Sequence, residues 1–195
     1  MKKDKSCLIN FIKNTNCISE DKAIEIANYF NEIIIQKNNF FLEEGAICNQ
    51  YLFLETGFMR AFTMDIDGND VTTNFYSNQQ IVFEVASYFQ QKPSNENIQA
   101  LTYCKGWVGN HELFMKLFHT IPEFREFGRT ILVKEFIALK ERNLSMINQN
   151  AELRYEKLIN SNTELFQYAP LKFIASYLGI TDTSLSRIRK DFFRK

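Results

Sequence analysis

The chain has 195 residues, of which 45% are hydrophobic, and its 23 basic and 23 acidic side chains leave a formal net charge of zero. This composition is typical of a globular protein with one large or two small domains, and the neutral total excludes attraction to nucleic acid through overall charge. The sequence contains no apolar run of the roughly 18 residues that a membrane helix needs, and polar residues interrupt the apolar part of its amino terminus. We therefore expect a cytoplasmic protein without a membrane partner.

The first 31 residues show two helical patterns, at about residues 4–14 and 19–31. From Ile33 the pattern changes to short apolar runs separated by glycine-containing turns, and Asp67-Gly68 has the composition of a tight hairpin turn. The runs lie at 33–35, 40–42, 51–54, 59–62, 71–75, 81–83, 98–101 and 106–108. Short strands at this spacing predict a small antiparallel barrel or sandwich.

Helical patterns return at residues 111–118, and Pro122 suits the start of a longer helix that extends to about residue 147. Its apolar residues occupy more than one face, which indicates that one side covers the strands and another meets a second copy of the chain. The residues expected in this dimer helix are Phe124, Phe127, Ile131, Phe136 and Leu139. A helix packed entirely within one subunit is the alternative. The polar segment 143–150 that follows is the expected hinge.

Residues 170–190, PLKFIASYLGITDTSLSRIRK, have the pattern of a helix-turn-helix. Pro170 suits a first helical position, and Gly179 can adopt the left-handed conformation that ends a helix. Thr181 can cap a second helix that buries Leu185 and Ile188. An ordinary helical hairpin is the alternative interpretation. Basic residues crowd the last nine positions and can supply local phosphate contacts: Arg187, Arg189, Lys190, Arg194 and Lys195.

This order of parts resembles the Crp–Fnr family of bacterial transcription regulators, and residues 151–190 resemble its short members from the Bacteroidetes group. The resemblance covers nearly the whole chain, and Gly45 and Gly57 match turn glycines of the family. It implies an α+β fold with an antiparallel β-roll of the cyclic-nucleotide-binding type, a double-stranded β-helix, at 1–120. A dimerisation helix at 121–147 and a helix-turn-helix domain at 148–195 complete it. The few residues after Lys190 leave no room for the family's two-stranded wing.

The resemblance further implies a homodimer that binds double-stranded operator DNA through residues 181–190, with RNA polymerase as a further partner. The residues matched to base reading are Thr183, Ser184 and Arg187, and those matched to phosphate contacts are Lys172, Arg189 and Lys190. Asp182 and Thr183 stand where relatives often carry arginine and glutamate, so we expect a different operator. A ligand-binding or scaffold protein that does not bind DNA sequence-specifically is the alternative.

The segment that corresponds to the family's phosphate cassette departs from it. The cassette resembles F-G-E-L-A-L-L-D-G-K-P-R-S-A-T, whereas residues 83–97 read F-E-V-A-S-Y-F-Q-Q-K-P-S-N-E-N. Val85 replaces the glutamate that binds the ribose hydroxyl, Ser94 replaces the arginine that pairs with the cyclic phosphate, and Glu96 would repel that phosphate. We therefore expect that cyclic AMP is not the effector.

The remaining candidate for an effector site is a more apolar pocket around this segment, formed by Tyr76, Phe83, Val85, Ser87, Tyr88 and Ser94. A filled core that binds no ligand is the alternative, given the 19 phenylalanines.

The cysteines and histidines fit no pattern of a metal, iron–sulfur or haem site. Cys7, Cys17, Cys48 and Cys104 include no C-x-x-C pair, and His111 and His119 have no acidic or cysteine partner at ligand spacing. Residues 33–109 contain no histidine, which argues against a cupin-like metal oxygenase. We therefore expect reduced thiols, no cofactor, no metal and no enzymatic activity.

Overall fold

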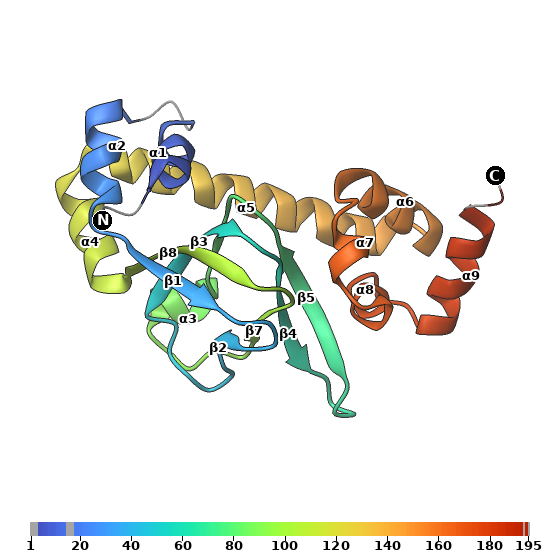
Figure 1. Ribbon diagram of the computed structural model, residues 1–195. Helices are drawn as coiled ribbons and strands as arrows, with labels where there is room; N and C mark the ends of the chain where they lie inside the picture. The colour runs from blue at the N-terminus through green and yellow to red at the C-terminus, as the bar shows by residue number, and fades with distance from the viewer. Residues whose placement is uncertain (1–3, 15–17, 193, 195) are drawn as a thin grey trace.

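The computed structural model describes residues 4–14, 18–192 and 194, and it places a β-roll beside one half of a long helix and a helical region beside the other half (Figure 1). The strands are β1 Asn31–Ile35, β2 Phe40–Leu42, β3 Gln50–Thr56, β4 Met59–Met64, β5 Asp70–Tyr76, β6 Gln80–Val82, β7 Asn97–Ala100 and β8 Cys104–Asn110. The helices are α1 Ser6–Lys13, α2 Glu20–Ala27, α3 Val85–Gln90, α4 His111–Thr120, α5 Pro122–Asn148, α6 Ala151–Ser161, α7 Leu165–Tyr168, α8 Leu171–Tyr177 and α9 Asp182–Phe192.

The roll consists of two four-stranded antiparallel sheets, with strand orders β1-β8-β3-β6 and β2-β7-β4-β5. The predicted hairpin at Asp67-Gly68 joins β4 to β5, and Gly68 adopts a positive φ of 78°. Gly57, with φ of 118°, is required for a second reason: a Cβ there would lie 2.6 Å from Cys104 Sγ. The apolar sides of the two sheets form the main core. The predicted α+β class and antiparallel roll are confirmed.

Helix α5 begins at Pro122 and continues without interruption to Asn148. The predicted hinge at 143–150 is therefore wrong over most of its length, because only Gln149 and Asn150 separate α5 from α6. This part of α5 is held by the helical region, since Arg142 Nη2 donates to the Tyr177 carbonyl at 3.1 Å. Asn150 then caps α6, accepting from the Leu153 N–H at 2.9 Å. The polar residues of this segment therefore lie in a continuous helix and at the cap of the next one, and not in a hinge.

Helices α8 and α9 form the predicted helix-turn-helix (Figure 1). Gly179 has a φ of 65°, and the Ile180 N–H bonds to the Ala175 carbonyl at 3.0 Å, as in the left-handed helix ending that glycine allows. Thr181 Oγ1 accepts from the Ser184 N–H at 3.2 Å and caps α9 as expected. Pro170 occupies the cap of α8 and not its first helical position.

The helical region shares its core with the roll. Phe58 and Leu101, from the turns of the roll, are buried in the same cluster as Ile174 of α8 and Leu185 of α9. Helix α8 also lies along β5, where the Thr72 N–H donates to Ser176 Oγ at 3.1 Å. The roll therefore holds the first helix of the helix-turn-helix directly.

Arg60 of β4 is a buried cation at this contact, with only 3% of its surface exposed. Its two terminal nitrogens each donate to the Asp70 carboxylate at 2.6 Å. Its guanidinium carbon lies 4.0 Å from the ring centroid of Phe62 and 3.4 Å from that of Phe173 in α8. The charge is thus neutralised within the roll and covered by a ring of the helix-turn-helix.

Cys7, Cys48 and Cys104 are free thiols, and Cys17 lies outside the described residues. Among the helices that the structure describes, none is both long and apolar enough to span a membrane.

Candidate functional sites

The outer face of α9 carries the predicted base-reading residues. Thr183 and Arg187 are exposed, and Ser186 and Lys190 are exposed on the same side because residues three and four apart share a helix face. Ser184 lies at the edge of this face, half-buried, and its hydroxyl receives a hydrogen bond from Thr181 at 3.0 Å. Ser186 was not among the predicted base-reading residues, although the buried Leu185 and Ile188 place it on the outer side of the helix.

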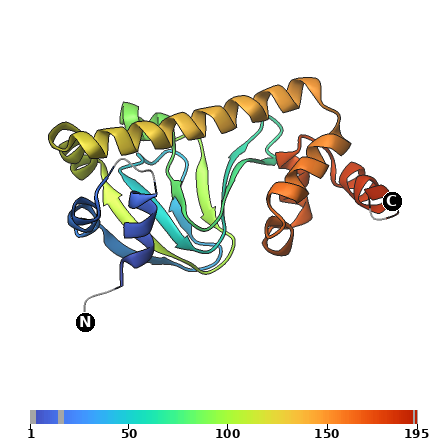
Figure 2. The ribbon, with the colours of Figure 1, turned by 90° about the horizontal axis from the view of Figure 1, so that it is seen from above.

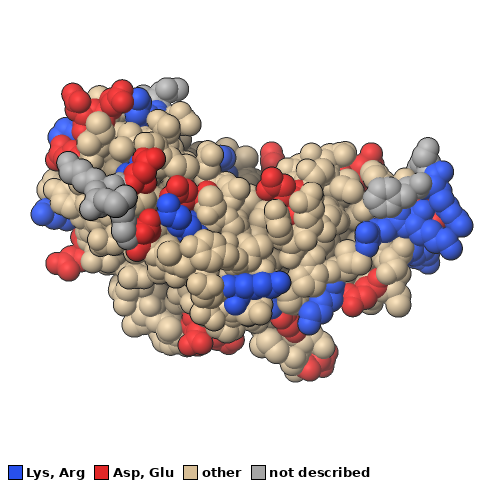
Figure 3. All heavy atoms as spheres, viewed as in Figure 1, with Lys and Arg blue, Asp and Glu red and all other residues tan. Residues whose placement is uncertain are grey.

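The residues predicted to contact phosphate are spread over two helices. Lys190 is exposed on α9, whereas Arg189 is half-buried and its Nε has no hydrogen-bond partner in the described part of the chain. Lys172 is exposed on the first turn of α8, with its Nζ 5.0 Å from the Phe173 ring. Figure 3 shows Lys and Arg atoms gathered at the end of the molecule that carries α9. Lys195 lies outside the described residues.

The residues expected in the dimer helix fall on two different faces of α5. Phe124 and Phe127 are buried in the core of their own chain, and Ile131 packs against that core, so these three lie on the side of the helix that covers the roll and not on a side open to a second copy. The first turns of α5 cover the roll, which accounts for their burial. Phe136 and Leu139 are exposed, at 69% and 61%.

A second set of apolar residues on α5 is exposed, and we call it the α5 stripe. Its members recur at spacings of three, four and seven residues, which places them on one face. They are Val133, Phe136, Ile137, Leu144 and Ile147. Figure 2 shows that α5 runs along one side of the molecule, with the roll and the helical region on its other side.

The stretch aligned with the phosphate cassette, residues 83–97, follows β6 and forms the short helix α3 and the loop that leads into β7. Glu84 caps α3, and its carboxylate accepts from the N–H groups of Ala86 at 2.9 Å and Ser87 at 2.6 Å. The amides at the start of α3 are therefore occupied by a carboxylate of the same chain. An incoming phosphate would have to displace this negative charge.

The two substituted cassette positions do not supply phosphate or ribose contacts. Val85 is half exposed, and Ser94 is 1% exposed with its hydroxyl donating to the Glu96 carbonyl at 2.8 Å. Burial raises the pKa of the Glu96 carboxyl, and the neighbouring Glu84 raises it further. Burial also raises the pKa of Tyr76, which lies near Glu96. Two carboxylates, Glu84 and Glu96, therefore act on this part of the roll, with Arg142 of α5 as a nearby cation.

The predicted effector pocket is only partly formed. Phe83 and Tyr88 line a cavity, whereas Tyr76, Val85, Ser87 and Ser94 do not. Ser87 instead has a structural role, because its hydroxyl accepts from the Cys48 N–H at 2.9 Å and donates to the Lys92 carbonyl at 2.5 Å.

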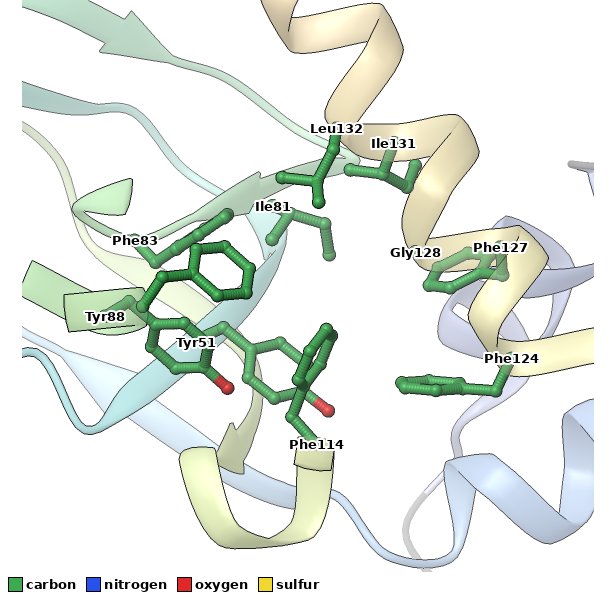
Figure 4. A pocket seen from close by; sticks show the side chains of 11 residues that line it. Tyr51, Ile81, Phe83, Tyr88, Phe114, Phe124, Phe127, Gly128, Ile131 and Leu132 are labelled. Carbon is green, nitrogen blue, oxygen red and sulfur yellow. The ribbon is translucent and has the colours of Figure 1, made fainter. Parts of the chain in front are cut away.

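The cavity lies between α3, α4, α5 and strands β3 and β6, and we call it the aromatic cavity (Figure 4). Its volume is about 40 Å³. It is lined by Tyr51, Ile81, Phe83, Tyr88, Phe89, Phe114, Phe124, Phe127, Gly128, Ile131 and Leu132. Neighbouring rings meet edge to face, for example Tyr88 and Phe114 at 5.8 Å between centroids. Residues from five elements line this cavity, so no local pattern in the sequence could place it. The high phenylalanine content was the only signal.

In the described ranges, no three histidine, cysteine, aspartate or glutamate side chains lie close enough together to hold a metal ion. His111 instead packs edge to face on Tyr88, with 5.1 Å between ring centroids.

Comparison with known proteins agrees with this architecture. Residues 32–120 match the family model of the cyclic nucleotide-binding domain. A protein from Eubacterium rectale described as a Crp/Fnr-family transcriptional regulator is 13% identical, with a TM-score of 0.72 over 94% of this chain and 87% of that one. CooA from Carboxydothermus hydrogenoformans is 17% identical, with a TM-score of 0.70 over 94% and 84% of the two chains. FixK2 from Bradyrhizobium japonicum is 13% identical, with a TM-score of 0.71 over 85% of each chain. No curated protein sequence matches the chain. At these identities the structural likeness shows a shared fold.

Proposed function

Because residues 32–120 belong to the cyclic nucleotide-binding domain family and the whole chain has the fold of Crp/Fnr transcription regulators, we propose that it binds operator DNA as a homodimer and regulates transcription. The observation that carries this proposal is the exposed face of α9, where Thr183, Ser186, Arg187 and Lys190 lie together. The second helix of a helix-turn-helix enters the major groove, and hydroxyl and guanidinium groups are suited to its base edges.

Each polar residue of this face has a proposed role. Arg187 binds the O6 and N7 acceptors of a guanine, and Thr183 contacts an adjacent base, with Ser184 at the edge of the same surface. Asp182, at the start of α9, accepts from a cytosine amino group and disfavours a phosphate at that position. The proposed phosphate contacts are Lys172, Arg189 and Lys190.

The α5 stripe is the proposed dimer contact. Val133, Ile137, Leu144 and Ile147 recur at the spacings that join two helices side by side, with Lys140 at the intervening position. An exposed phenylalanine beside this row, Phe136, adds apolar area that a second copy would remove from water. The dimer would place two α9 helices on one face for a two-fold operator.

We further propose that cyclic AMP does not control this regulator. Val85 cannot accept a hydrogen bond from ribose, the Ser94 hydroxyl is bonded within its own loop, and Glu84 occupies the amides of α3. Isothermal titration calorimetry with cyclic AMP should therefore give no heat of binding at micromolar concentrations. A micromolar dissociation constant would contradict this part of the proposal.

DNA binding is tested by fluorescence anisotropy with duplexes from the region upstream of the protein's own gene, at roughly 50 to 200 mM salt. Affinity should fall with salt, and Arg187→Ala should lose about 1–3 kcal/mol and relax one base position. Lys116→Ala is the matched control, because it removes one exposed charge from α4, away from α9.

The alternative, a ligand-binding or scaffold protein of the same fold, predicts a different result. The dimer would then form normally, while the wild type and Arg187→Ala would bind every duplex with the same weak affinity. Retention of the wild-type base preference by Arg187→Ala would exclude our assignment of α9. The proposal includes no catalytic activity.

A further inference from the structure

A second cleft, separate from the roll, lies between α5, α6 and the end of α8. Its volume is about 250 Å³, near the lower end of the range for small-molecule sites, and no strand contributes to its lining. Its charged lining residues are three cations, Arg142, Arg154 and Lys157, and one acid, Glu141, and we call it the basic cleft. None of the residues that line it belongs to the α5 stripe.

The guanidinium of Arg154 is held in place by backbone carbonyls. Its Nη1 donates to the Gln149 carbonyl at 2.6 Å, and its Nε and Nη2 donate to the Leu178 carbonyl at 3.3 and 2.8 Å. These carbonyls belong to the ends of α5 and α8, and a helix end carries only about half a negative charge. Arg154 therefore adds a fixed and only partly neutralised positive charge to the wall of the cleft.

The other two cations keep donors that no group of the described chain uses. Arg142 Nη2 donates to the Tyr177 carbonyl at 3.1 Å, whereas Arg142 Nη1 has no partner among the described residues and is not buried. Lys157 is exposed and lies three residues after Arg154, on the same face of α6. Within the described ranges, neither Lys157 nor Glu141 forms an ion pair. Donors from α5 and from α6 are therefore available to an occupant.

The charges that face the cleft do not balance. Three cations stand against the single carboxylate of Glu141, and the carbonyl ends of α5 and α8 together offset roughly one further charge. Glu96 of the roll acts on Arg142 from farther away, but it does not line the cleft, and no ion pair joins the two in the described part of the chain. A positive charge of about one therefore remains, which attracts an anion and repels a cation.

From these observations we propose that the basic cleft binds a phosphate monoester of a small organic alcohol. Arg142 Nη1 and Lys157 Nζ bind the phosphate from two different helices. Donors from separate directions suit the oxygens of a tetrahedral phosphate better than the two coplanar oxygens of a carboxylate. Met146, Leu158 and Leu178 form an apolar part of the wall, which receives the carbon body of the ester.

The basic cleft adjoins the turn of the helix-turn-helix. Its wall includes Tyr177 and Leu178 at the end of α8, and the next residue, Gly179, lies so close to Met146 of α5 that a Cβ there would be 2.7 Å from Met146 Cε. An occupant that bridges α5 and α6 holds this turn in one position and thereby changes the affinity for operator DNA. This consequence rests on the proposed function, whereas the binding site itself does not.

The test measures ligand binding without DNA, on the full-length protein with 13C-labelled methionine and leucine methyl groups. Three probes are compared at roughly 20 mM salt, where screening is weak: butyl phosphate, 1-butanol and inorganic phosphate. Butyl phosphate should shift the signals of Met146, Leu158 and Leu178, while Met59 and Leu52 in the core of the roll serve as remote references. It should bind at least about tenfold more tightly than butanol and roughly 2- to 5-fold more tightly than inorganic phosphate, because only the ester contacts both the cations and the apolar wall.

Two changes of charge at the cleft should act in opposite directions. Lys157→Met removes one cation and should weaken binding of butyl phosphate roughly 3- to 10-fold, whereas Glu141→Gln removes the opposing carboxylate and should strengthen it roughly 2- to 5-fold. Both side chains are exposed, so we expect both variants to fold. Lys116→Met removes an exposed cation from α4 and is the matched control, which should leave binding unchanged.

The outcomes separate the site from its consequence. Equal affinity for butyl phosphate and butanol, no methyl shift with butyl phosphate, or undiminished binding in Lys157→Met would overturn the proposal. Inorganic phosphate that binds as tightly as the ester would overturn the assignment of an organic body. Binding of butyl phosphate without any change in operator affinity would leave the site standing and would contradict only its effect on the helix-turn-helix.

Discussion

Replacing Asp70 by asparagine should destabilise the protein more than replacing its buried partner Arg60 by methionine. Arg60 is 3% exposed, and Asp70 supplies both carboxylate oxygens to its guanidinium at 2.6 Å, while the Asp70 side chain keeps 29% of its surface in contact with solvent. The two groups therefore differ in what happens when the other is removed. Asp70 can regain water, whereas Arg60 cannot.

The magnitude follows from this asymmetry. Removing one partner of a buried ion pair costs about 3–5 kcal/mol when the remaining charge stays buried. Gln99 Oε1, at 3.3 Å, and the rings of Phe62 and Phe173 still stabilise Arg60 in Asp70→Asn, so we expect about 3 kcal/mol. For a chain of this length this corresponds to a fall in Tm of about 6–12 °C. Arg60→Met removes the buried charge, keeps an apolar stem between the rings and should cost only about 1 kcal/mol.

The assay is urea unfolding at neutral pH, together with hydrogen exchange of the amides in α8 and β5. Exchange should accelerate there in Asp70→Asn, because Phe173 and Ser176 connect the pair to α8, and should not change in α1 and α2. Glu126→Gln is the control, since the Glu126–Arg129 pair is as short, 2.7 Å, but at least half exposed, and should be worth about 0.5 kcal/mol or less. The reasoning is refuted if Asp70→Asn costs no more than this control, or less than Arg60→Met.

Three further changes test other parts of the structure. Burial raises the pKa of the Glu96 carboxyl above its ordinary value of 4.5 in the folded state, so folding favours the protonated carboxyl and the protein loses stability as the pH rises through the raised pKa. Glu96→Gln should therefore raise Tm at neutral pH and match the wild type below pH 4.5. Phe136→Glu should convert the proposed dimer to monomer in sedimentation velocity while the far-UV circular dichroism stays unchanged, because this ring is 69% exposed in one chain, and a dimer of unchanged affinity would contradict the α5 stripe as the contact. Gly179→Ala should lower the free energy of unfolding by about 1–2 kcal/mol, because alanine is strained at a φ of 65° and its Cβ would lie 2.7 Å from Met146 Cε. An unchanged urea midpoint would contradict this and show that the turn adapts.

The sequence pattern predicted the strands and the helix-turn-helix because local chemistry determines both, whereas the arrangement of the strands as a roll came from the family resemblance. Alternating apolar runs and turn glycines such as Gly57 and Gly68 set the strands, and Gly179 and Thr181 end one helix and begin the next. These signals act over a few residues, so they can be recognised without tertiary contacts. The start of α5 at Pro122 is equally local.

The errors concern contacts between distant segments. The apolar residues of α5 lie on more than one of its faces, so their spacing could not decide that Phe124 and Phe127 face the roll while Phe136 faces outward. The predicted hinge was wrong because polarity was interpreted as flexibility, whereas α5 continues to Asn148 and Arg142, just before the segment, donates to the Tyr177 carbonyl. The helix α3, capped by Glu84, was not predicted, and the aromatic cavity depends on five elements that only the fold brings together.

Besides the core that it shares with Phe58 and Leu101, the helix-turn-helix has two attachments that respond differently to a shift of α5. One attachment runs along α5 itself, through Arg142 and Met146, which lie about 21 Å and about 27 Å from Gly128 at roughly 1.5 Å per helical residue. The other is the lateral contact of α8 with Arg60 and Thr72. If α5 slides along the roll, both attachments cannot keep their present geometry. The continuous helix deforms less readily than a contact of side chains, so the contact at Arg60 is the one that has to yield, and its strength limits how far α9 can move.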